Sequence, residues 1–209
     1  MIFKKLMVGI ALVLALMLAP AISKADVVEL SPGQILIEAG VGLLDYGDFI
    51  VATSHKRIKH YEILLHTPGG VAYTCIAIMN HMELLQSRGI TFTTVNNAFA
   101  MSAGTYIFMM GNERIVYEGS EFMFHGSLAQ KTQANRDWMK REQTEKYNNL
   151  FRIDSWLRMM LKRKMNWSDD IIKYLIDGGD QQFMSAEKAY GMGFATRYIS
   201  FNKQRQNIH

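Results

Sequence analysis

The sequence predicts an α/β fold in which a mostly parallel sheet is flanked by helices. Segments with an extended apolar pattern alternate with segments of helical spacing over most of the chain. The run 90–95, rich in β-branched residues, has the composition of a strand between two such helical segments. The stretch 133–164 contains no Gly or Pro, and its apolar residues recur near helical spacing, which indicates one long helix or two joined ones.

The first half of the chain repeats a strand-then-helix order. Its expected extended segments are 35–37, 62–66 and 90–95, and its expected helices are 48–56 and 73–87. Pro68-Gly69-Gly70 is read as a turn between a strand and the second helix, which ends before Gly89. Because strand–helix–strand units in one sheet have right-handed crossovers, this order predicts parallel strands.

The second half continues the alternation and ends in helices. Its expected strands are 114–117 and 122–124, and its expected helices are 105–110, 133–164 and 171–176. Ser168, followed by Asp169 and Asp170, supplies an N-cap for the last of these helices. No internal repeat occurs, so one domain accounts for the pattern.

The N-terminus has the pattern of an export signal. Lys4 and Lys5 precede an apolar run, 6–18, and Ser23-Lys24-Ala25 supplies the small residues of a cleavage site. We expect removal of residues 1–25 and a mature domain of residues 26–209, located in the periplasm or secreted. A cut after Ala21 and an uncleaved inner-membrane anchor are the alternatives, although the apolar run is shorter than the roughly 20 residues of a spanning helix.

Charge and cysteine content narrow the function classes. The chain has a formal net charge of +4, and loss of Lys4, Lys5 and Lys24 would leave 20 basic against 19 acidic residues, which gives no reason to expect nucleic acid. Cys75 is the one cysteine, so no intrachain disulfide can form, and its helical apolar pattern indicates a buried hydrophobe. The scattered histidines His55, His60, His66 and His81 are read as surface or locally hydrogen-bonded groups, and we expect no metal site.

Three segments carry residues suited to acyl-transfer chemistry. Ser102 lies among small residues where a strand gives way to a helix, which is where several hydrolases place a nucleophile. Gly69-Gly70 can leave backbone N–H groups free to stabilise an oxyanion. His125 ends a strand-like segment and is placed to act as a base. Each feature alone also fits a structural role. The small residues around Ser102 would suit tight helix–sheet packing, Gly69-Gly70 would make a turn, and His125 would be a capped histidine at a strand end.

In this order the three segments resemble the Clp protease proteolytic subunit family, the ClpP-like serine peptidases. A fourth segment, 183–193, is similar to the stretch that follows the catalytic aspartate in that family, so the resemblance extends over about 35–199. It implies a ClpP/crotonase-type α/β fold and a ring-forming homo-oligomer. It also implies that the long helix projects and interlocks with a partner from the opposing ring. The alternative is that this helix packs only on its own domain.

The resemblance assigns roles to particular residues. Ser102 would be the nucleophile and His125 the base and then the acid, and the N–H groups of Gly70 and Ala103 would form the oxyanion hole. The acid of the triad departs from the family pattern.

The usual aspartate position holds Gln181 here, and Asp180 lies one residue upstream. Asp180 is the assigned acid, Asp177 is a second candidate, and a Ser-His pair without an acid is a third.

The expected function is that of an exported serine peptidase acting on peptides or unfolded chains, without metal or organic cofactor. No ATPase partner is expected if the protein is exported, because ATP is not expected outside the inner membrane. One alternative is a signal peptide peptidase A-like Ser-Lys enzyme, whose nucleophile segment loosely resembles Ser102–Tyr106. The other is an oligomeric scaffold with weakened catalysis.

Overall fold

The computed structural model describes residues 27–126, 142–177 and 181–201, and for 142–148 only the backbone. Within these ranges the strands are β1 Val27–Ser31, β2 Gln34–Val41, β3 His60–Gly70, β4 Thr91–Met101, β5 Glu113–Tyr117, β6 Glu121–Phe124, β7 Gln182–Ser185 and β8 Arg197–Ile199. The helices are α2 Asp45–Ala52, α3 Ala72–Ser87, α4 Ala103–Met109, α5 Glu142–Met165, α6 Asp169–Asp177 and α7 Ala186–Gly191. The proposed export signal lies outside the described residues.

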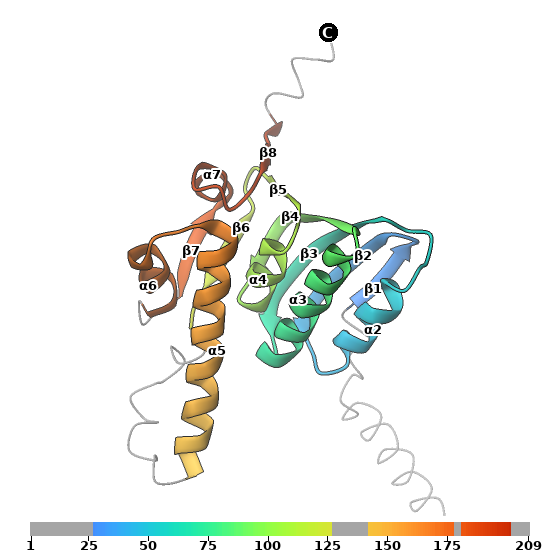
Figure 1. Ribbon diagram of the computed structural model, residues 1–209. Helices are drawn as coiled ribbons and strands as arrows, with labels where there is room; N and C mark the ends of the chain where they lie inside the picture. The colour runs from blue at the N-terminus through green and yellow to red at the C-terminus, as the bar shows by residue number, and fades with distance from the viewer. Residues whose placement is uncertain (1–26, 127–141, 178–180, 202–209) are drawn as a thin grey trace, which may run out of the picture.

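The described strands form one mostly parallel sheet, as the sequence predicts. Its order is β1-β2-β3-β4-β5-β8, and β6 pairs with both β4 and β7. The β1–β2 and β6–β7 pairs are antiparallel, and the remaining pairs are parallel. Helices α2, α3 and α4 lie side by side on one face of this sheet (Figure 1).

Strand β4 divides its length between two neighbours. Its first part pairs with β5, with Asn96 opposite Val116, and its last part pairs with β6, with Met101 opposite Met123. The buried Asn96 lies at the fork, where its Nδ2 donates to the carbonyl of Glu121 at 2.9 Å. The fork brings the end of β6 beside the end of β4.

The long helix α5 packs on its own domain along one stripe. Ile153, Leu157 and Leu161 are buried in the core, whereas Phe151 and Met159 on the same helix are exposed. The alternative that this helix packs on its own domain is therefore confirmed for the inner stripe, whereas the outer residues are exposed in the part of the chain that the structure describes. The predicted helical residues 133–141 lie outside the described residues.

Several predicted boundaries were wrong. Pro68-Gly69-Gly70 is not a turn, because β3 continues through Gly70 and α3 begins at Ala72. Helix α2 begins and ends earlier than 48–56. Strand β4 runs on to Met101, and β1, β7, α7 and β8 had not been expected.

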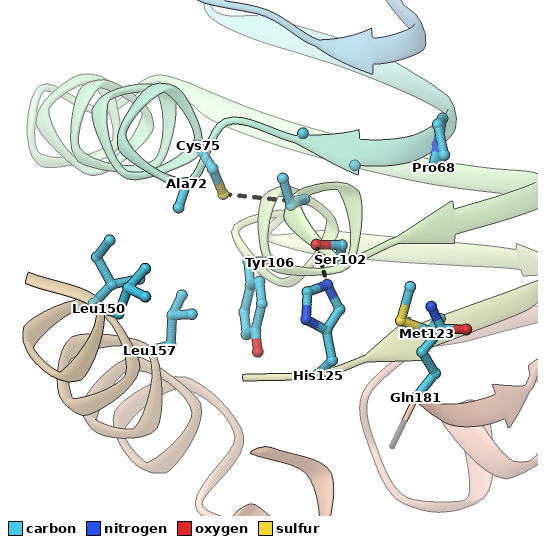
Figure 2. A pocket seen from close by; sticks show the side chains of 14 residues that line it. Pro68, Ala72, Cys75, Ser102, Tyr106, Met123, His125, Leu150, Leu157 and Gln181 are labelled. Carbon is cyan, nitrogen blue, oxygen red and sulfur yellow. Dashed lines mark hydrogen bonds between the residues drawn. The ribbon is translucent and has the colours of Figure 1, made fainter. Parts of the chain in front are cut away.

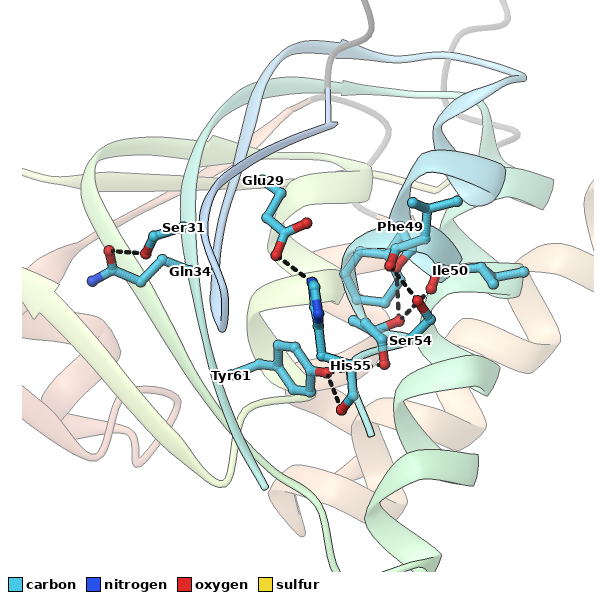
Figure 3. Close-up of polar contacts among 10 residues, drawn as sticks. Glu29, Ser31, Gln34, Phe49, Ile50, Ser54, His55 and Tyr61 are labelled. Carbon is cyan, nitrogen blue, oxygen red and sulfur yellow. Dashed lines mark hydrogen bonds and ion pairs between the residues drawn. The ribbon is translucent and has the colours of Figure 1, made fainter. Parts of the chain in front are cut away.

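Polar contacts hold the β1–β2 hairpin and the loop after α2 together (Figure 3). His55 Nε2 lies 2.6 Å from Glu29 Oε1, and the buried Tyr61 hydroxyl donates to the carbonyl of Thr53 at 3.0 Å. His60, His66 and His81 also have local partners, in Thr91, Glu38 and Thr53 respectively. The interpretation of these histidines as surface or locally bonded groups is confirmed.

No helix in the described ranges has the length and apolar character needed to cross a bilayer.

Candidate active site

Ser102 occupies a strained turn between β4 and α4. Its φ of 52° and ψ of −117° are unusual for a residue other than glycine, and such a conformation costs of order 1–3 kcal/mol. Two contacts from the end of β6 maintain it. The Ser102 N–H donates to the carbonyl of Met123 at 2.8 Å, and the buried Thr105 hydroxyl lies 3.0 Å from the same oxygen. The turn is thus fixed relative to the strand that carries His125.

His125 follows β6 directly and contacts Ser102. Its Nε2 lies 2.7 Å from Ser102 Oγ, and its Nδ1 lies 3.0 Å from the carbonyl oxygen of Gly126 (Figure 2). A carbonyl only accepts hydrogen bonds, so Nδ1 carries the proton and donates it. In the neutral imidazole, Nε2 is then unprotonated and accepts the hydrogen bond from the serine hydroxyl, which is the arrangement a general base requires.

Gly69 brings β3 into contact with the Ser102 turn, and Gly70 lets β3 approach Val41 in β2. A Cβ on Gly69 would lie 2.5 Å from Ser102 Cβ and 2.9 Å from the Ala103 nitrogen, and Gly69 has a φ of +96°. The N–H of Val71 donates to Val41 in β2 at 2.8 Å. Gly70 packs against the backbone of Val41 and lines the same cavity as Ser102. Close approach, and not a turn, is what these glycines provide.

Ala103 is the first residue of α4. The N–H groups of the first helical turn have no acceptor inside their own helix, so that of Ala103 is available at the side of Ser102. It therefore lies at the same turn as the serine hydroxyl, across from Gly69.

A cavity of about 450 Å³ opens beside Ser102 and His125 (Figure 2). Its remaining lining is mostly apolar and comes from Pro68, Ala72, Cys75, Tyr106, Met123, Leu150, Ile153 and Leu157, with Gln181 at its edge. The α5 residues in this lining were not assigned to the site from the sequence. Their spacing indicated an apolar stripe but could not indicate what the stripe faces.

Cys75 and Tyr106 are buried groups in the cavity wall. The Cys75 thiol donates to the carbonyl of Ala103 at 3.4 Å, and burial raises its pKa to about 12, so it serves as the predicted buried hydrophobe. Burial also raises the pKa of Tyr106, with smaller contributions from Cys75 and then Asp154. The Tyr106 hydroxyl has no hydrogen-bond partner among the described residues.

The acid of the predicted triad is not among the groups seen at His125. Asp180 lies outside the described residues. Asp177, the second candidate, forms an ion pair with Arg158 between α6 and α5. Gln181, at the usual aspartate position, contributes to the cavity lining near Met123 (Figure 2). Within the described residues, the group that holds Nδ1 is therefore the Gly126 carbonyl.

Comparison with protein families gives a match over most of the chain. The family model described as Clp protease matches residues 46–201, a range that includes Ser102, His125, the two glycines of β3 and the whole cavity lining. No curated protein matches the chain.

Proposed function

The chain belongs to the Clp protease family, and from this premise we propose that it is an exported serine peptidase that cleaves peptides or unfolded chains. The observation that carries the proposal is the 2.7 Å contact between Ser102 Oγ and a His125 ring whose Nδ1 proton is held by a carbonyl. A serine hydroxyl is a weak nucleophile until such a base removes its proton.

In this mechanism Ser102 Oγ attacks the carbonyl carbon of the substrate while His125 Nε2 takes the hydroxyl proton. The same nitrogen then gives the proton to the leaving amine, and an acyl-enzyme remains on Ser102. A water molecule, deprotonated by His125, hydrolyses the ester and regenerates the serine.

The N–H groups of Gly70 and Ala103 would stabilise the negative charge on the substrate oxygen. Both residues line the cavity beside Ser102, and the absence of large side chains lets the substrate backbone come close. Loss of one such donor typically lowers turnover by ~10²–10³.

Asp180 remains the proposed acid of the triad. In enzymes where the acid alone sets the histidine tautomer, loss of the acid lowers kcat by ~10⁴. Here the Gly126 carbonyl also selects that tautomer. We therefore expect Asp180→Asn to cost less than this factor in kcat, measured with a peptide substrate beside Asp177→Asn.

The partners follow from the family and from the proposed export. Clp proteases are in general ring-forming peptidases, so a homo-oligomer is expected. Residues 1–25 would direct the chain to the periplasm or outside the cell, and there it would act without an ATPase on chains that are already unfolded. Comparison of the N-terminal sequence of the protein from periplasmic and membrane fractions tests cleavage against anchoring.

Labelling of the purified protein with a fluorophosphonate probe tests the catalytic centre. Ser102→Ala and His125→Ala are made in parallel, and particle mass is measured on the same samples. Loss of labelling in both variants supports an activated Ser-His centre. An assembled, folded particle without labelling would contradict the peptidase and favour the scaffold. Labelling that persists in His125→Ala would favour a lysine base, although no lysine lines the cavity in the described part of the chain.

A further inference from the structure

Asp154, on helix α5, is a buried aspartate to which the mechanism above gives no role. Its side chain is only 3% exposed. Burial of a carboxylate is costly, and aspartate is almost never this deeply buried unless other groups compensate. The neighbours of Asp154 therefore indicate what the carboxylate does.

Asp154 lies against the residue that orients His125. A Cβ placed on Gly126 would be 3.1 Å from Asp154 Oδ2, so the carboxylate packs directly on Gly126. The carbonyl of Gly126 accepts the hydrogen bond from His125 Nδ1, and its N–H donates to Ile176 in α6 at 3.1 Å. Asp154 thus approaches the His125–Gly126 segment from the α5 side.

The other ionisable groups around His125 do not supply a negative charge that could stabilise its protonated ring. Tyr106 on α4 and Cys75 on α3 are neutral near pH 7, because burial raises the pKa of both. Arg158 on α5 is paired with Asp177 on α6. After burial and Cys75, Asp154 is the next contribution that raises the pKa of Tyr106, which indicates that its charge acts within the cavity wall.

We propose that Asp154 is a positioning residue for His125. It packs against Gly126, which holds Nδ1, and it stabilises the imidazolium that forms when His125 takes the proton of Ser102. This inference rests on the proposed serine peptidase function and deepens it. In proteins, an opposite charge close to an ionisable group favours its charged form and commonly moves its titration by about one pH unit or more.

The test is the pH dependence of fluorophosphonate labelling of Ser102 in the full chain, compared with Asp154→Asn. The labelling rate falls on the acid side as His125 becomes protonated. Without the neighbouring negative charge protonation is less favourable, so the acid limb of Asp154→Asn is expected to move down by about one pH unit. The maximal rate is expected to fall about tenfold, because the imidazolium in the transition state is also less stabilised.

Asp45→Asn is the matched control. Asp45 is also 3% exposed, and it accepts the N–H of Gly42 at the start of α2, away from the cavity. This variant is expected to lose stability but to keep the acid limb of the unmodified protein. Asp154→Glu keeps the charge, so its labelling rate is expected to fall at the same acidic pH as that of the unmodified protein. Asp154→Ser is the second neutral variant if Asp154→Asn does not fold.

An acid limb that coincides in Asp154→Asn and the unmodified protein would overturn the inference and leave the proposed function standing. A limb that moves in Asp180→Asn but not in Asp154→Asn would assign the role to Asp180 and overturn it too. A shift in Asp154→Asn supports it, whether or not Asp180→Asn also shifts. Absence of labelling in the unmodified protein at every pH would overturn the proposed function, and this inference with it.

Discussion

Gly69 is the residue that allows β3 to lie against the Ser102 turn. In Gly69→Ala the alanine would have to adopt a positive φ, and its Cβ would overlap the Ser102 side chain. We expect the free energy of unfolding to fall by about 2–5 kcal/mol, from the backbone strain and the overpacking together. Labelling of Ser102 should slow by at least about a hundredfold, since small displacements of reacting groups have effects of that size.

Gly89→Ala separates these two causes. Gly89 also has a positive φ, of +80°, but a Cβ there would meet no atom within 4 Å. It should therefore cost only about 1–2 kcal/mol, measured by urea denaturation, and leave labelling unchanged. Equal effects of the two variants would contradict the close approach at Gly69.

His81 makes a contribution to stability that depends on pH. Its Nε2 lies 3.0 Å from the Thr53 hydroxyl, and burial, followed by the charge of Arg88, lowers its pKa below 6.5. Between the folded value and 6.5 the unfolded chain binds more protons than the folded one, so stability falls as pH decreases below about 6.5. Urea denaturation between pH 7.5 and 5.0 should show a weaker pH dependence in His81→Gln, whereas equal slopes would count against this assignment.

The Ser102–His125 pair could be predicted from the sequence because each residue is part of a short local motif. Ser102 stands where an extended segment becomes helical, and His125 ends a strand-like run. The contacts of the Gly126 carbonyl and the role proposed for Asp154 could not be found in this way, because they depend on how α5 and α6 pack against the end of β6. Backbone acceptors also leave no trace in residue type.

Helices α5 and α6 are linked by the pair of Arg158 and Asp177, whose side chains are 32% and 44% exposed. An ion pair this accessible to water contributes at most about 1 kcal/mol. Asp177→Asn should therefore lower stability by less than that amount and keep Ser102 labelling. Thermal denaturation and probe labelling measure the two effects. A loss of labelling as complete as in Ser102→Ala would instead identify Asp177 as the acid of the triad.

The predictability of the elements depends on their length and on local signals. Helix α3 was placed to within one residue, and the Ser168 cap of α6 was correctly identified, with its Oγ accepting the Ile171 N–H at 3.4 Å. Strand β4 was ended too early because two asparagines, at 96 and 97, have low strand propensity, which pairing with β6 overrides. β7 and β8 are too short to show a period.

The molecule as a whole leaves large apolar side chains uncovered on α5. Phe151 and Met159 are 57% and 51% exposed, although the opposite stripe of the helix is buried. Singly exposed apolar residues are common, but in a ring-forming family such residues on a long helix are suited to contact a second copy. We expect the protein to be an oligomer in which α5 contributes to the contact between rings.

Phe151→Asp tests this contact by placing a charge where an apolar interface would exclude water. If Phe151 lies between two rings and not between neighbours in one ring, light scattering should give a particle of about half the mass. Leu84→Asp, which changes a leucine on α3 that is 46% exposed, is the control and should keep the full mass. An unchanged mass in Phe151→Asp would place the interface elsewhere.

Assembly and catalysis should then be coupled through the same helix. Leu150 and Ile153 line the cavity beside Ser102, and Phe151 lies between them in sequence but faces outward. A partner that holds Phe151 would also restrict movement of the cavity wall, so half-sized particles should label more slowly than full ones from the same preparation. Equal labelling rates in the two fractions would mean that α5 keeps its position without a partner, and that its inner stripe of apolar contacts is sufficient to shape the cavity.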